Sequence, residues 1–115
     1  MSPRIAPLSQ GIFYVVTGLW PIVHLKSFER VSGPKVDKWL VKTTGGLIAA
    51  VGTALVIGSF EHRTSRALRI LGLASAIALG AADLLYSLKG RVSKVYLADA
   101  AAEGAAVATW IATTN

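Results

Sequence analysis

Two carboxylates stand one helical turn apart within an otherwise apolar stretch near the end of the chain. Asp99 and Glu103 lie in the segment 95–113, which is rich in alanine and contains no lysine or arginine. Residues four apart share one face of a helix, so both acids are expected to point the same way. Acids inside a membrane-spanning helix are costly, and they mark a functional site or a buried contact. The pair therefore identifies where chemistry is expected.

A third acid, Asp83, stands in the preceding apolar stretch at a matching distance from the intervening turn. With Arg91 as the apex of that turn, Asp83 lies eight residues before it and Asp99 eight residues after it. At a rise of about 1.5 Å per residue, both acids lie about 12 Å from the apex along antiparallel helices, and Glu103 lies about 6 Å deeper. We therefore expect Asp83 and Asp99 to meet at one level, with Glu103 one turn deeper.

Hydroxyl groups and one backbone carbonyl are expected close to these acids. Pro21 has no N–H to donate to the carbonyl of Thr17, which is left free at about the depth of Glu103. Tyr86 and Tyr96 lie nearer the turn and can donate hydrogen bonds to the acids. The predicted ligand- or ion-binding residues are Asp83, Asp99, Glu103, Thr17, Tyr86 and Tyr96.

The chemistry open to such acids is limited by their surroundings. With no base beside them inside the membrane, two or three acids cannot all stay ionised unless they share protons, bind a cation or reach water. Arg91 and Lys94 lie towards the interface and can extend back to Asp83 or Asp99. The acids therefore form either a site for a proton, a metal cation or a cationic organic molecule, or a set of contacts between helices.

Membrane-spanning helices must position these acids. Of the 115 residues, 53% are hydrophobic and 16% are charged, whereas soluble domains carry about 25% charged residues. Each apolar block approaches the roughly 20 residues that cross a bilayer core, and backbone groups in lipid must be paired within helices. We predict an all-α fold, an integral membrane bundle of four transmembrane helices that forms a single domain over residues 1–115. The four blocks cover about 8–25, 40–60, 67–88 and 95–113.

The connections between the blocks indicate orientation. The first, 26–38, mixes lysines with apolar side chains, which suits an interfacial amphipathic stretch, and Pro34 suits the start of the next helix. The other two are short, so the last three helices are expected to be antiparallel neighbours. Eight basic residues surround the first and third connections and four lie on the opposite side. The positive-inside rule then places both termini outside the cytoplasm.

The partners indicated by composition are lipids and other membrane helices. The net charge is +6, but the bases fall between apolar blocks, so anionic lipid headgroups are expected rather than nucleic acid. Small residues at Gly72, Ala76 and Gly80 allow close packing within one chain, in a homo-oligomer or in a larger membrane complex. His24 and His62 are too isolated to indicate a metal site. No nucleotide-binding or hydrolase motif is present, and no cofactor is indicated.

Two segments carry a resemblance to a known group of proteins. They read DLLYSLKGRVSKVYLADAAAE over 83–103 and SGPKVDKWLVK over 32–42. Together they resemble small four-helix bacterial membrane proteins of unassigned function. The resemblance implies a multi-pass protein of the bacterial inner membrane and supplies no activity. The length and helix count are also similar to small multidrug resistance transporters, which depend on a glutamate in the first helix, where this chain has none.

Three functions remain open from the sequence. The first is binding or transport of a proton, cation or cationic small molecule by the acids. The second is a non-catalytic accessory or structural subunit of a membrane complex, in which the acids are contacts between helices. The third and least favoured is an intramembrane acid–base enzyme acting on a lipid-like substrate. A cavity leading from one face favours the first, acids without a route to water favour the second, and a closed lipid-like pocket favours the third.

Overall fold

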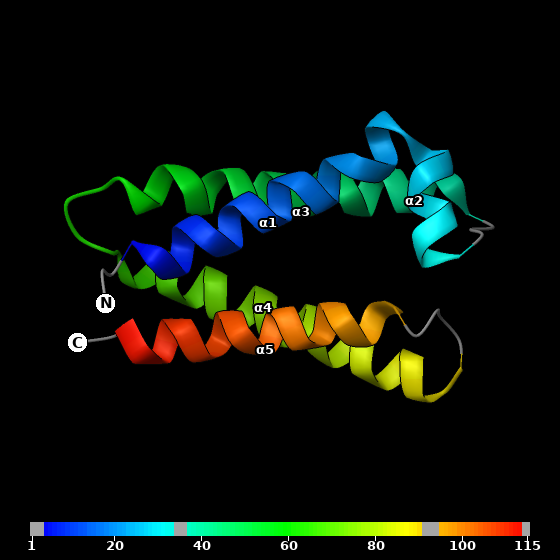
Figure 1. Ribbon diagram of the computed structural model, residues 1–115. Coiled ribbons are helices and arrows are strands. Elements are labelled where there is room, and N and C mark those ends of the chain that lie inside the picture. Colours follow the sequence, from blue (N-terminus) through cyan, green and yellow to red (C-terminus); the bar gives the residue numbers. More distant parts are fainter. Residues whose placement is uncertain (1–3, 34–36, 91–94, 114–115) are drawn as a thin grey trace.

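The computed structural model describes residues 4–33, 37–90 and 95–113, and over these residues the protein is all-α (Figure 1). The predicted all-α fold is confirmed. The long helices coincide with the four apolar blocks to within a few residues, and one shorter helix lies where the first connection was expected. The helices are α1 (Ile5–Val23), α2 (Leu25–Ser32), α3 (Lys38–Ser59), α4 (Arg66–Leu88) and α5 (Val95–Thr113).

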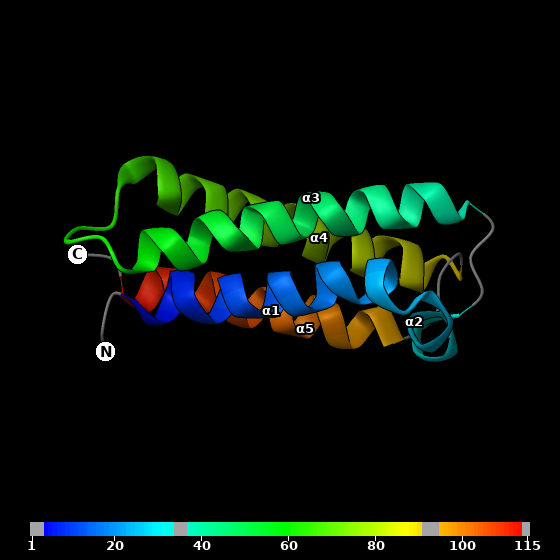
Figure 2. The ribbon, with the colours of Figure 1, turned by 90° about the horizontal axis from the view of Figure 1, so that it is seen from above.

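The long helices form two antiparallel pairs, α1 with α3 and α4 with α5, which lie beside each other (Figures 1 and 2). Glycine brings the first pair together. A Cβ atom at Gly18 would collide with the carbonyl oxygen of Gly45, and one at Gly52 would come 2.7 Å from the carbonyl oxygen of Gly11. The two backbones therefore touch directly, which is how helices pack in lipid, where van der Waals contact replaces the hydrophobic driving force.

The second pair is packed through the predicted ridge of small residues on α4. The Trp110 ring covers Gly72, where a Cβ would meet the indole at 2.5 Å, and Gly80 faces Glu103. Ala76, between them, has no exposed surface. The ridge thus faces α5 of the same chain. It fixes the level of α5 against α4 by contacts at both ends.

Polar groups are buried and large aliphatic side chains face outward. Gln10 and Glu103 are 3% and 2% exposed, whereas Val16, Leu47 and Ile111 are 60% or more exposed. A soluble protein shows the opposite arrangement, because large exposed apolar surfaces are unstable in water. The arrangement is consistent with a membrane protein.

Three of the helices, α1, α3 and α4, are long and apolar enough to cross a membrane. The predicted four-span bundle is therefore supported in part. α5 has 19 residues but does not reach the same hydropathy, since Asp99 and Glu103 reduce it.

The helix ends group in two sets (Figure 1). The termini of the described chain lie at one end together with the connection between α3 and α4, and α2 lies at the other end with the last turn of α4 and the first turn of α5. The predictions made for Pro34, Arg91 and Lys94 concern positions outside the described residues.

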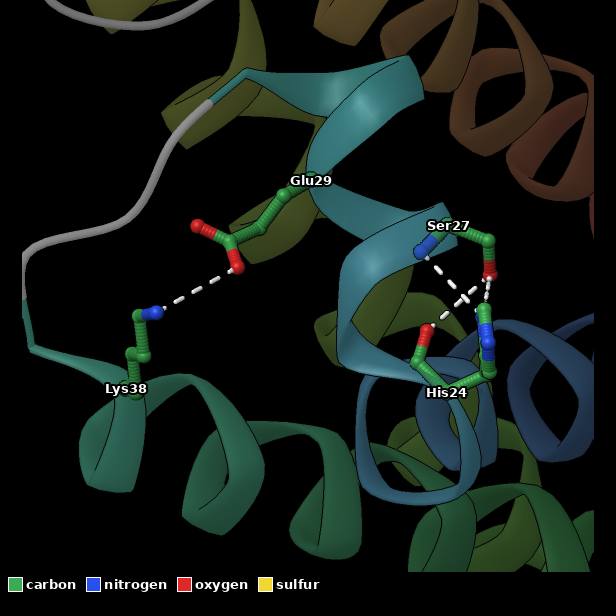
Figure 3. A network of polar contacts seen from close by, with 4 residues as sticks. All are labelled: His24, Ser27, Glu29 and Lys38. Carbon is green, nitrogen blue, oxygen red and sulfur yellow. Dashed lines mark hydrogen bonds and ion pairs between the residues drawn. The ribbon is translucent and has the colours of Figure 1, made fainter.

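The helix α2 was not predicted, although its signals are present in the sequence. His24 ends α1 and caps α2, because its Nδ1 accepts the backbone N–H of Ser27 at 3.2 Å. The Trp20 indole donates to the Ser27 hydroxyl at 2.8 Å. Glu29 then pairs with Lys38 at 3.7 Å, which links α2 to the start of α3 (Figure 3). Together these contacts fold α2 back against the end of the bundle.

Candidate functional site

The three acids identified from the sequence lie together. Asp83 of α4 and Asp99 and Glu103 of α5 each have a carboxylate oxygen within 4.8 Å of the others. Asp83 and Asp99 lie near the end of the α4–α5 hairpin that is at the same end of the bundle as α2, and Glu103 lies one turn deeper. The antiparallel pairing of α4 and α5 produces this arrangement, because residues equally far from a shared turn meet at one level.

The acids open on a cavity of about 350 Å³ between the two helix pairs. Its other walls are largely apolar. They come from α1 through Pro21, from α2 through Phe28, from α3 through Leu40 and Ile48, and from α4 through Leu79. The cavity is partly open, and Leu40 at its edge is 47% exposed. It therefore combines an acidic wall with an apolar interior.

The described residues that line this cavity carry no positive charge to balance the acids. Among the described residues that line it there is no lysine, arginine or histidine. One carboxylate oxygen, Oδ2 of Asp83, is buried without a hydrogen-bond partner in the described part of the chain. A buried acceptor without a donor is costly, so a ligand that supplies a positive charge or a proton donor would be stabilised here.

The hydroxyl-bearing residues predicted for the site divide into two groups. Thr17 and Tyr96 line the cavity with the acids. The Thr17 hydroxyl donates to the carbonyl of Phe13 at 2.7 Å, which leaves its oxygen lone pairs to accept. Tyr86 is 44% exposed on α4 and is not among the described lining residues. The structure thus brings five of the six predicted residues to one cavity and places Tyr86 outside it.

A buried polar group beside the acids was missed. The Tyr14 hydroxyl donates to Oε1 of Glu103 at 2.6 Å, and Gln10 and Trp110 continue the hydrogen bonding on the other side of Tyr14. These contacts join α1 to α5. The signal was available, because Gln10, Tyr14, Thr17 and Pro21 follow each other at intervals of four, three and four and therefore share one face of α1.

The chemistry supported by these groups is that of a cation site. Three carboxylates offer the oxygen ligands that a metal cation takes, and they also offer a counter-charge to an organic ammonium group. Asp83, Asp99 and Glu103 are the described residues able to hold a metal as a group. Comparisons of the chain with protein-family models, curated proteins and solved structures found no match.

Proposed function

We propose that the protein is a protein of the bacterial inner membrane with four membrane-spanning helices, and that it binds a cation through Asp83, Asp99 and Glu103. The observation that carries this proposal is the acidic wall of an otherwise apolar cavity without a described basic side chain. Opposite charges interact strongly where water is scarce, at about 4 kcal/mol for a separation of 4 Å and an effective dielectric constant near 20. A cation entering the cavity would gain this interaction with the acids.

The cavity favours a cationic small molecule with an apolar body over a bare ion. Its volume of about 350 Å³ is at the lower end of the range of small-molecule pockets, about 300–1,000 Å³. The apolar walls suit a hydrocarbon body, and the rings of Phe28 and Tyr96 suit a cation nearby. A hydrated metal ion would use the acids and leave the apolar walls without a partner.

Four membrane crossings, including α5, belong to this proposal. α5 packs along α4, exposes Ile111 to the outside and returns the chain to the end where α1 begins (Figure 1). If α4 crosses the bilayer, its antiparallel neighbour of 19 residues extends through the same depth. The bias of basic residues towards the end that contains α2 supports placing both termini outside the cytoplasm.

An accessory or structural subunit is the second candidate, and one observation favours it. The hydrogen bond from Tyr14 to Glu103 ties α1 to α5, so at least one acid serves as a contact between helices. In that case the acids would hold the bundle together or join a larger membrane complex, and added cations would have no effect on stability.

Thermal unfolding of the purified protein with added cations distinguishes the two candidates. The probes are phenylbutylamine, tetramethylammonium, Na⁺ and Mg²⁺. A ligand that binds only the folded state raises stability by about 2.7 kcal/mol at one hundred times its dissociation constant. We expect phenylbutylamine to stabilise the wild type and to stabilise Asp83→Asn much less. Glu61→Gln, which changes an exposed acid outside the cavity, is the matched control. If no probe changes the unfolding temperature, the cation-binding proposal is contradicted and the accessory-subunit candidate is favoured.

A further inference from the structure

A continuous chain of buried hydrogen bonds runs from Trp110 to the acidic cluster. The Trp110 indole N–H donates to Oε1 of Gln10 at 2.6 Å. The Gln10 amide nitrogen donates to the Tyr14 hydroxyl at 3.1 Å and to the carbonyl of Gly72 at 2.9 Å. The Tyr14 hydroxyl then donates to Oε1 of Glu103 at 2.6 Å. Helices α1, α4 and α5 all contribute to this chain.

The direction of the chain is fixed by its first donor. An indole N–H can only donate, so the Gln10 atom that faces it must be the amide oxygen. The amide nitrogen must then face Tyr14 and the carbonyl of Gly72, which is a pure acceptor. Rotating the amide by half a turn would set oxygen against oxygen at Gly72 and nitrogen against the indole N–H. Gln10 is therefore held in one orientation from two sides.

The orientation of Gln10 determines the role of Tyr14. The Tyr14 oxygen accepts from Gln10, so its single proton is directed at Glu103. Oε1 of Glu103 is thereby committed to accepting. Glu103 lines the cavity, and Oε2 is its oxygen that Tyr14 does not bind. Both Tyr14 and Gln10 are buried, at 1% and 3% exposure, so water does not compete with this arrangement.

We propose that Tyr14 and Gln10 are positioning residues that hold Glu103 as an acceptor through Oε1 and direct its second oxygen to the ligand in the cavity. This inference rests on the proposed function for the ligand, whereas the state of the Glu103 carboxyl group can be measured without any ligand. Gln10 acts only through Tyr14.

The test compares Tyr14→Phe with Tyr86→Phe, which removes the same hydroxyl from an exposed tyrosine outside the cavity. Infrared spectra of the ligand-free wild type and of each ligand-free variant are recorded first and subtracted from one another. The bands of the Glu103 carboxyl group are those that disappear in Glu103→Gln. We expect these bands to shift in Tyr14→Phe and to stay in place in Tyr86→Phe. Phenylbutylamine affinity should fall about tenfold in Tyr14→Phe alone, the factor for one hydrogen bond of ordinary strength.

The outcomes separate this inference from the proposed function. Unshifted Glu103 bands in Tyr14→Phe overturn the inference, whether or not a ligand binds. Shifted bands with full phenylbutylamine affinity also overturn it, because positioning would then not serve the ligand. Shifted bands in a protein whose wild type binds no probe support the positioning of Glu103 and overturn the proposed function.

A second measurement keeps the test decisive if Tyr14→Phe does not fold. The hydrogen bond is then read from the tyrosine side, using isotope-labelled tyrosine in the wild type and in Glu103→Leu, which removes the acceptor. A shift of one tyrosine C–O band supports the proposed bond. Tyrosine bands identical in both proteins would overturn it.

Discussion

Asp83 and Asp99 face each other across the antiparallel pair of α4 and α5, with carboxylate oxygens within 4.8 Å. Two ionised carboxylates at such a separation repel each other by on the order of 3–4 kcal/mol at an effective dielectric constant near 20. Neither has a described basic neighbour in the cavity. A shared proton or a bound cation would relieve this repulsion.

Removing one of these charges is expected to stabilise the ligand-free protein. Asp99→Asn should raise the free energy of unfolding by about 1 kcal/mol, because repulsion is relieved while side-chain volume is kept. Chemical unfolding followed by circular dichroism measures the change. Asp37→Asn is the control, since Asp37 precedes α3 and makes no capping hydrogen bond with its side chain. A loss of stability in Asp99→Asn would show that the acid is instead a structural contact.

The close crossing of α1 and α3 should not accept side chains. Gly18→Val would drive a side chain into the backbone of α3 at Gly45 and Ala49, and overpacking of this kind costs about 1–3 kcal/mol or more. We expect a lower unfolding temperature in detergent. Gly104→Ala is the matched control, because the space around Gly104 is open and alanine favours a helix by about 1 kcal/mol. Equal stability of the two variants would contradict the direct backbone contact.

Labelling of single cysteines tests the four crossings, and the chain has no cysteine of its own. Arg63→Cys and Thr113→Cys should both react with an impermeant reagent from outside intact cells. Lys89→Cys should react only after the membrane is opened. Labelling of Arg63→Cys together with protection of Thr113→Cys would show that α5 does not cross. If Lys89→Cys alone reacted in intact cells, the orientation of the protein would be opposite to the one proposed.

Phe28 is the residue through which α2 contributes to the cavity, and it packs against Trp20 with ring centroids 5.4 Å apart. Phe28→Ala removes apolar surface that an organic body would contact, so phenylbutylamine affinity should fall about tenfold. Binding of tetramethylammonium should change less, since it has little apolar body. Phe60→Ala is the control at an exposed position. An equal loss of affinity for both cations would indicate that Phe28 acts through the fold.

The meeting of the acids could be predicted because it depends on one hairpin. Asp83 and Asp99 are equally far from a short turn, and Glu103 follows Asp99 by one helical turn, so helix geometry alone sets their levels. The limits of the long helices followed from apolar length in the same way. Tyr86 was predicted to lie in the site only from its depth along α4. Its position around the helix axis directs it outward, where it is 44% exposed.

The contribution of α1 to the site could not be predicted from the depth of its residues along the bundle. Which face of α1 meets α5 depends on how the two helix pairs pack, and that is set by contacts between the pairs, such as those of Gln10 with Gly72 and Trp110. The polar face containing Gln10 and Tyr14 was visible as a spacing, but no local rule assigns it to Glu103. The helix α2 was missed because the whole segment 26–38 was read as a connection, although His24 and Ser27 supply the cap of α2.

Binding of a matched pair of ligands tests the central claim most directly. Phenylbutylamine carries a positive charge at neutral pH, and phenylbutanol has nearly the same shape without it. In titration calorimetry of the wild type, the amine should bind at least about tenfold more tightly than the alcohol, a difference of about 1.4 kcal/mol. In Asp83→Asn this preference should shrink or vanish while weak binding of the alcohol remains. Equal affinities for the two compounds, or no heat of binding from either, would contradict a cation site formed by the three acids.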